Sequence, residues 1–168
     1  MLLYQDVISN DEMITDAFTI VEVDDIAYEV DCKMITIKEG ADVDIGANAS
    51  AEEATEELED GMIQVNNIAY SMRLVETQFD KKSFMTYIKG FMKSVKKYLE
   101  ENNPDRLPAF EAKIQPFVKK VIGSFKDYEF YVGESMNPDG GVAMLNYRED
   151  GVTPFFTFFK DGLKIQKL

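Results

Sequence analysis

The chain contains no histidine and one cysteine, and these absences remove most common catalytic and metal-binding arrangements. Without histidine there is no Ser-His-acid or Cys-His nucleophilic site, no histidine general base and no histidine-ligated zinc or iron. Cys32 alone cannot form an intrachain disulfide or a paired-thiolate metal site, and a single thiol suits a reducing compartment. We therefore expect no zinc, no required cofactor and no histidine-dependent enzyme.

Long apolar runs are also absent. In the N-terminal stretch MLLYQDVISN no basic residue precedes the apolar residues, and Asp6 interrupts them, so we expect no signal peptide. No run approaches the roughly 20 apolar residues that cross a bilayer as a helix. Together with the single thiol, this pattern predicts a cytoplasmic protein that does not insert in a membrane.

Positive charge is scarce but concentrated. The chain has 18 Lys and Arg residues against 31 Asp and Glu residues, a net charge of −13, which disfavours nucleic acid and anionic membranes as partners. Residues 80–127 hold eleven basic and six acidic residues, a balance of +5, which leaves −18 for the rest. This asymmetry fits a basic arm on an acidic body, although charged faces that only keep the protein in solution explain it equally well.

Apolar residues in this basic segment follow helical spacing. They recur every three or four positions from Phe84 to Leu99 and again from Leu107 to Phe125, on either side of the polar stretch ENNPD. The pattern predicts a helical hairpin over about 81–126, with Asn103 and Pro104 at the start of its second helix. Pro116 is expected to bend that helix without dividing it.

The rest of the chain favours strands in a single domain, residues 1–168. FTIVEVDDIAYEVDC predicts two strands around an acidic turn, and the other predicted strands lie in KMITIK, QVNNIAYSMRLVETQF, EFYVG, VAMLNYR and TPFFTFFKDGLKIQKL. The phenylalanines between Phe155 and Phe159 are apolar on both faces, so we expect that strand to be covered on both sides. The predicted fold class is α+β: a largely antiparallel, β-rich core with an inserted helical hairpin.

Residues 39–61 lack any period and hold nine acidic residues and no aromatic residue, which predicts a flexible acidic loop. Carboxylate oxygens are the ligands that calcium prefers, but the spacing of an EF-hand loop is absent. We therefore expect at most weak calcium binding. Its candidate ligands are Glu52, Glu53, Glu56 and Glu57.

Two motifs resemble the signatures of the translationally controlled tumour protein (TCTP) family. IGANASAEEAT at 45–55, with Asn48, Ser50 and Glu52, resembles the first signature, and FYVGESMNPDGGVAMLNY at 130–147 resembles the second. ISNDEM near the N-terminus and YREDGVTPFFTFFKDGLK near the C-terminus are also similar to that family. The resemblance implies a β-rich, tent-like core with a protruding helical hairpin and a flexible acidic loop. That fold is similar to zinc-containing accessory proteins of Rab GTPases, whose paired cysteines this chain lacks.

The resemblance also implies a function. The family is cytoplasmic, is partly associated with the cytoskeleton, and is linked to calcium, to tubulin and microtubules, to small GTPases, and to a translation elongation factor with its exchange factor. Glu12 in SNDEM and Glu134 in VGE match positions tied to GTPase contact. On this basis we expect a non-enzymatic binding protein in which both carboxylates contact the partner.

The residues themselves leave other hypotheses open. Tubulin has acidic tails, so the hairpin lysines Lys89, Lys93, Lys96 and Lys97 are candidates for docking to it. A holdase-like chaperone would use the apolar face of the hairpin, and a calcium-dependent protein would use the acidic loop. An enzyme built on carboxylates alone has little support, since no carboxylate pair occupies an apolar strand end. We interpret the Glu134-Ser135 pair as part of a turn with an exposed charge at its edge, and not as an active site.

Overall fold

The strands form three antiparallel sheets in the part of the chain that the structure describes, residues 1–38 and 61–168 of a computed structural model. A six-stranded sheet has the order β3-β4-β10-β9-β8-β7, a three-stranded sheet has the order β11-β1-β2, and β5 pairs with β6. The strands are β1 (Leu2–Asp6), β2 (Glu12–Thr15), β3 (Ile20–Val23), β4 (Ala27–Asp31), β5 (Met34–Lys38), β6 (Met62–Asn66), β7 (Val75–Thr77), β8 (Glu129–Val132), β9 (Val142–Tyr147), β10 (Pro154–Phe159) and β11 (Leu163–Lys167). The α+β prediction is confirmed.

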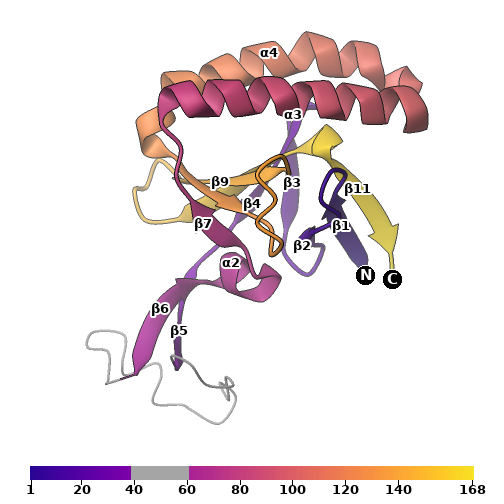
Figure 1. Ribbon diagram of the computed structural model, residues 1–168. Helices are drawn as coiled ribbons and strands as arrows, with labels where there is room; N and C mark the ends of the chain where they lie inside the picture. The colour runs from indigo at the N-terminus through magenta and orange to yellow at the C-terminus, as the bar shows by residue number, and fades with distance from the viewer. Residues whose placement is uncertain (39–60) are drawn as a thin grey trace.

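The predicted helical hairpin is also confirmed and lies across the top of the sheets (Figure 1). Its helices are α3 (Lys81–Asn102) and α4 (Leu107–Gly123), joined through a 3-10 turn at Pro104–Arg106. Asp80 and Ser83 form a reciprocal capping box that begins α3. Asn103 and Pro104 occupy the cap and first-turn positions of that 3-10 turn, although the Asn103 side chain makes no cap hydrogen bond. Helix α4 continues through Pro116 as one helix.

The apolar face of the hairpin is buried. The residues that line it at helical spacing are all buried: Phe84, Ile88, Phe91, Val95, Leu99, Phe110, Ile114, Phe117, Val118 and Val121. They pack with Phe130, Met144 and Phe159 from three strands of the six-stranded sheet. A holdase would need this face exposed, so its burial argues against that hypothesis. Within the described residues, no helix is both long and apolar enough to cross a membrane.

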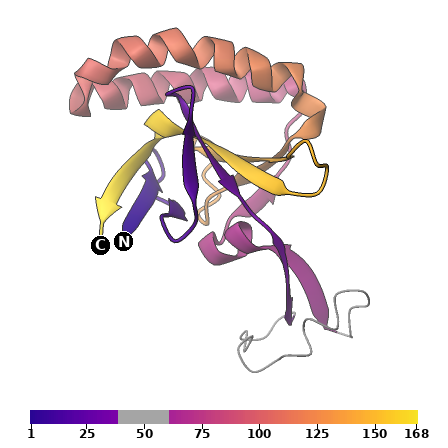
Figure 2. The same cartoon turned by 180° about the vertical axis from the view of Figure 1, so that it is seen from behind.

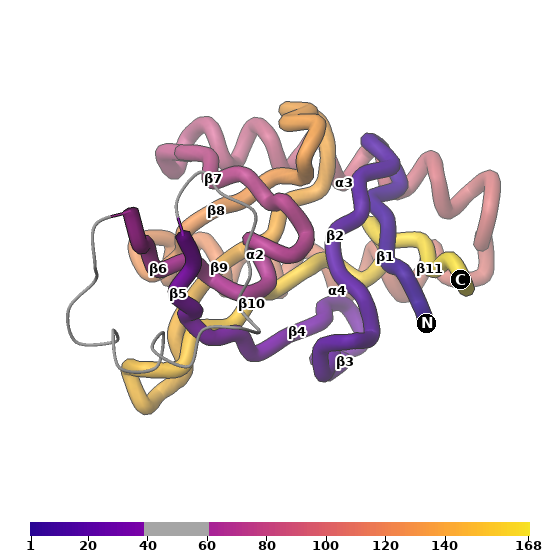
Figure 3. The backbone as a smooth tube through the Cα atoms, turned by 90° about the horizontal axis from the view of Figure 1, so that it is seen from below, coloured from indigo at the N-terminus to yellow at the C-terminus, as the bar shows by residue number. Residues whose placement is uncertain are grey.

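Strand β10 is buried at all six residues, as its two-sided apolar pattern predicts. Phe159 faces the hairpin, whereas Phe156 and Phe158 belong to a second apolar cluster on the other face. That cluster includes Ile68 of helix α2 (Asn67–Met72) and the single cysteine, Cys32, which is buried. Seen from below, α2 and the β5–β6 ribbon lie in front of the sheet (Figure 3). The sheet is therefore covered on both sides.

The prediction of one strand in residues 64–79 is wrong. This segment contains the end of β6, then helix α2, then β7. The Asn66 carboxamide oxygen accepts hydrogen bonds from the Ile68 and Ala69 amides, both at 3.0 Å, which starts the helix. Arg73, in the left-handed conformation with φ 57°, ends it. The two caps stabilise a helix in this segment although its residues also have a high β propensity.

An ion-pair network fixes the hairpin turn to the sheet. Arg106 is 13% exposed and donates to both carboxylate oxygens of Asp161, at 2.8 and 2.9 Å. Its guanidinium also reaches the Asp25 carboxylate at 2.7 Å and the Asp25 carbonyl. Lys113 and Lys160 donate to the same carboxylate at 2.7 and 2.8 Å. Hydrogen bonds from Lys113, then Lys160 and Arg106, hold the pKa of Asp25 well below its usual range.

We predict that Asp25→Asn lowers stability at neutral pH and flattens its dependence on pH in acid. A carboxyl group with a lowered folded-state pKa stabilises the fold above its unfolded pKa of about 3.9, and this contribution is lost as the pH falls through the folded value. Urea unfolding at pH 7, 5, 4 and 3 measures the effect. The side chain of Asp25 is 39% exposed, so solvent screening limits its size.

Asp24→Asn is the matched control. Asp24 is the residue before Asp25 in the same turn, it also has a positive φ, and it makes no ion pair among the described residues. It should keep the acid dependence of the unmodified protein. Identical pH profiles for the two variants would contradict the assignment to Asp25.

Candidate functional site

Glu12 and Glu134 line one hollow of about 550 Å³, which we call the acidic hollow. It forms where the β1–β2 loop, the C-terminal end of α2 and the loop after β8 meet. Its lining residues are Gln5, Asn10, Asp11, Glu12, Ser71, Met72, Arg73 and Glu134. Three carboxylates and one guanidinium give it a formal charge of −2, so it favours a partner with exposed lysine or arginine.

Local geometry presents Glu12 to solvent. Asn10 has φ 66°, and the loop closes through backbone bonds from Asp6 to Asp11 at 2.8 Å and from Asn10 to Asp6 at 2.9 Å. The chain then enters β2, where Met13 and Ile14 are buried and Glu12 is exposed. The buried pair holds the strand in place, so the Glu12 side chain projects from a fixed backbone.

Asp11 ties the two loops of the hollow together. The Ser135 hydroxyl donates to an Asp11 carboxylate oxygen at 2.6 Å, and the Ser135 amide lies 3.3 Å from both oxygens. Gly133 packs so closely that an added Cβ would lie 2.7 Å from the Asp11 carboxyl carbon. Ser135 therefore holds the loop after β8 against Asp11. Sequence reasoning missed Asp11, although its neighbour Glu12 was named.

Glu134 is already paired in this structure. The Arg73 guanidinium lies 3.0 Å from its carboxylate, and the two side chains are 76% and 60% exposed. An exposed pair of this kind contributes about 0–1 kcal/mol. A cationic partner group can therefore replace Arg73 at little cost, whereas Glu12 has no ion pair among the described residues.

The candidate lysines for tubulin line a second hollow, which we call the lysine groove. It has a volume of about 700 Å³ between α3 and α4, and Phe110 and Ile114 contribute to its lining. Lys89, Lys93 and Lys97 are exposed. Lys96 is half-buried and lies 3.2 Å from Glu111. With Glu100 the groove has four lysines and two glutamates, so its formal charge is +2.

The first signature and the calcium candidates lie outside the described residues. This applies to Asn48, Ser50, Glu52, Glu53, Glu56 and Glu57. Among residues 1–38 and 61–168, no group of three or more acidic or cysteine side chains is arranged to hold a metal ion. Calcium binding through 39–61 stays a prediction.

We predict that Gly133→Ala destabilises the protein, because its methyl group would collide with Asp11. Overpacking of this kind costs about 1–3 kcal/mol. Urea unfolding measures the loss, and the amide resonance of Ser135 should shift as its contact with Asp11 is disturbed. The control is Gly90→Ala in α3, where nothing lies within 4 Å of an added Cβ. That change should stabilise the helix by about 0.5–1 kcal/mol; equal effects of the two changes would contradict the close approach.

Comparison with known proteins gives matches over the full length of the chain. The sequence profile of the family described as translationally controlled tumour protein matches residues 1–164. The translationally-controlled tumor protein homolog of Schizosaccharomyces pombe is 60% identical over 167 residues, 99% of each chain. The homolog of Saccharomyces cerevisiae is 54% identical over 168 residues, 100% of each chain.

Solved structures agree with these sequence matches. The translationally controlled tumor-associated protein p23fyp of Schizosaccharomyces pombe has a TM-score of 0.83 at 60% identity, and the match covers 100% of both chains. The NMR structure of translationally-controlled tumor protein from Caenorhabditis elegans has a TM-score of 0.72 at 33% identity, over 100% of this chain and 99% of the other.

Proposed function

Because the chain belongs to the translationally controlled tumour protein family, we propose that it is a non-enzymatic binding protein whose acidic hollow contacts a GTPase of the translation machinery. The observation that carries this proposal is the placement of Glu12 and Glu134 in one hollow. They come from segments 122 positions apart, and both side chains are exposed. The expected partners are a translation elongation factor, with or without its exchange factor, and small GTPases in the cytoplasm.

The chemistry of the hollow suits binding better than catalysis. The Ser135 hydroxyl is engaged with Asp11, and the chain has no histidine to activate it. Fixed carboxylates around a concave surface provide electrostatic complementarity to a basic surface, which sets partner choice and association rate.

We predict that the double change Glu12→Gln and Glu134→Gln weakens binding to the elongation factor about tenfold, which corresponds to about 1.4 kcal/mol. The change keeps side-chain size and removes two negative charges, so the loss should shrink as salt rises. Calorimetry with the elongation factor, alone and with its exchange factor, measures the affinity, and circular dichroism checks the fold.

The matched control removes two exposed carboxylates elsewhere, by Glu101→Gln at the end of α3 and Glu149→Gln after β9. This control should bind nearly as the unmodified protein does, which separates a local contact from the effect of net charge. If the two double variants lost affinity equally, the hollow would not be the contact.

The lysine groove favours a second function, binding to microtubules. Its four lysines gather on one surface of a protein with a net charge of −13, and tubulin has acidic tails. The apolar stems of the lysines can contact a peptide, while the ammonium groups pair with its carboxylates. The interaction would be electrostatic and therefore sensitive to salt.

We predict that Lys93→Glu with Lys97→Glu reduces microtubule co-sedimentation about tenfold at low salt, because two charges are reversed and the net charge at the groove changes by four units. Lys119→Glu with Lys120→Glu is the control, since these exposed lysines of α4 lie outside the groove. Binding that is indifferent to salt, or equal loss in both variants, would contradict a contact at the groove.

A further inference from the structure

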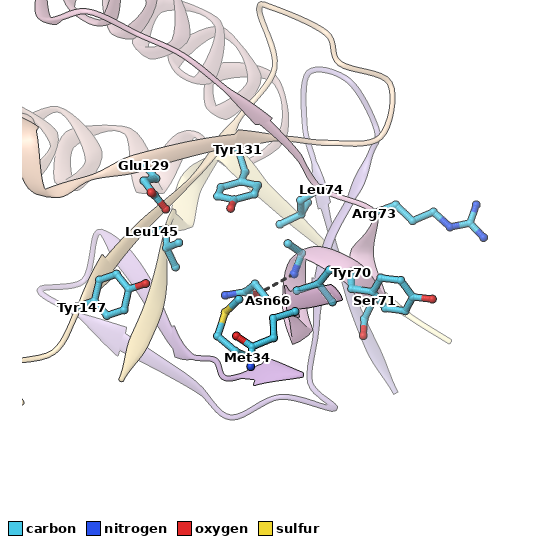
Figure 4. A pocket seen from close by; sticks show the side chains of 13 residues that line it. Met34, Asn66, Tyr70, Ser71, Arg73, Leu74, Glu129, Tyr131, Leu145 and Tyr147 are labelled. Atoms are coloured by element: carbon cyan, nitrogen blue, oxygen red, sulfur yellow. Dashed lines mark hydrogen bonds between the residues drawn. The ribbon is translucent and has the colours of Figure 1, made fainter. Parts of the chain in front are cut away.

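A third pocket, of about 780 Å³, lies between the six-stranded sheet and the segment that carries α2 (Figure 4). We call it the aromatic pocket. Tyr131 from β8 and Leu145 and Tyr147 from β9 form one side, and Met34 from β5 and Leu74 after α2 lie opposite. None of these residues belongs to the lysine groove or to the acidic hollow.

A buried hydrogen-bond donor without a partner lies in the lining of this pocket. Asn66 is 6% exposed, and its carboxamide oxygen is fully used as the cap of α2. Its amide nitrogen has no hydrogen-bond partner and points into the space between Leu145 and Met34 (Figure 4). Buried polar groups in proteins are nearly always paired, so this donor requires an explanation.

The thiol of Cys32 does not provide one. Burial raises the pKa of Cys32 and the neighbouring Asn66 side chain opposes that rise, so the two groups interact. Sulfur is a weak acceptor, however, and the Asn66 amide nitrogen makes no hydrogen bond of normal geometry with it. The site is suited to an oxygen acceptor supplied from outside.

The walls of the pocket are apolar and partly exposed. Met34 and Tyr147 are each 49% exposed, and Tyr70 on the same lining is 40% exposed, which is unusual for such large side chains gathered at one place. The Tyr131 hydroxyl points into the pocket (Figure 4). Burial raises the pKa of Tyr131 to about 12, so this hydroxyl stays protonated and uncharged at neutral pH. An apolar group of matching size would remove this surface from water.

Charge at the rim indicates the sign of the ligand. Glu129 is exposed at the edge of the pocket and makes no ion pair among the described residues. Arg73, at the opposite edge, is paired with Glu134. The free charge is therefore negative, as is the net charge of the chain, −13. A cationic group beside the apolar one would be attracted here, and an anionic group would be repelled.

We propose that the aromatic pocket binds a peptide segment of a partner protein, in which an aromatic or large aliphatic side chain stands next to a lysine or arginine. The apolar side chain fills the space between Tyr131, Tyr147 and Leu145. The Asn66 amide nitrogen is closed off from solvent, so a backbone carbonyl of the peptide accepts its free hydrogen when the lining side chains move aside. The basic side chain pairs with Glu129. This surface is additional to the acidic hollow, and since Ser71 and Arg73 line both, segments bound at the two would be neighbours.

The test is an NMR titration of the full chain with the blocked dipeptide acetyl-Phe-Lys-amide into the millimolar range. We expect saturable shifts of the Asn66 side-chain amide and of the backbone amides of Tyr131 and Leu145. Acetyl-Ala-Lys-amide should bind about tenfold more weakly, since it lacks the ring. Acetyl-Phe-Glu-amide should also bind more weakly because of Glu129. Equal affinity for all three peptides would overturn the proposal.

Two variants locate the site. Asn66→Ser keeps a capping oxygen for α2 but removes the free amide, and should weaken binding about fivefold. Tyr147→Ala removes an exposed wall with no expected effect on folding, and should weaken it about tenfold. Ile165→Ala, which removes a side chain of 53% exposure from β11, is the control and should bind normally. Normal affinity in Tyr147→Ala, or shifts confined to the lysine groove, would refute the assignment even if Asn66→Ser proved unstable.

Discussion

The contact between the apolar face of the hairpin and β10 determines how the rest of this protein is arranged. The Phe159 ring at the end of β10 lies 5.4 Å from that of Phe91 and 5.8 Å from that of Phe117, so both helices meet at one residue of the central sheet. Gly162 lies three residues after Phe159, and an added Cβ there would lie 2.7 Å from Phe91. Because β11 begins at the next residue, the same contact also directs the final strand toward β1, beside the N-terminus (Figure 2).

Apolar packing alone would allow the helical hairpin to slide or rotate on the sheet. The ion pairs that Arg106 of the hairpin turn makes with Asp25 and Asp161 prevent this movement. Arg106 has two carboxylate partners and a carbonyl, all within a part-buried region. Such a group is costly to bury unless every donor is satisfied, so only one position of the hairpin keeps it paired. The hydrophobic contact thus supplies most of the stabilisation, while Arg106 specifies the orientation. The lysine groove depends on both, because α3 and α4 form its two walls.

The sequence was sufficient to predict those helices and strands whose apolar residues recur at a regular spacing. Helical spacing predicted α3 and α4, and a strand apolar on both faces predicted that β10 is covered twice. It did not reveal α2, because Ile68 and Leu74 fit a strand as well as a helix, and the capping by Asn66 is local polar chemistry. It also could not show that Asp11 holds Ser135, 124 positions away, or that Arg106 reaches Asp25, 81 positions away. Contacts of this kind depend on the tertiary fold. Glu12 and Glu134 were named through family resemblance, and the structure adds that they share a hollow.

Helix α2 links the two surfaces below the sheet. Its first cap, Asn66, supplies the unpaired amide of the aromatic pocket, and its last cap, Arg73, supplies the cation that covers Glu134 in the acidic hollow. A partner that binds Glu134 must displace Arg73, and the released guanidinium then lies at the edge shared with the aromatic pocket. Binding in one place therefore changes the charge at the rim of the other. A released Arg73 would oppose a cationic segment in the aromatic pocket, so the two sites are expected to compete electrostatically even where their occupants do not touch.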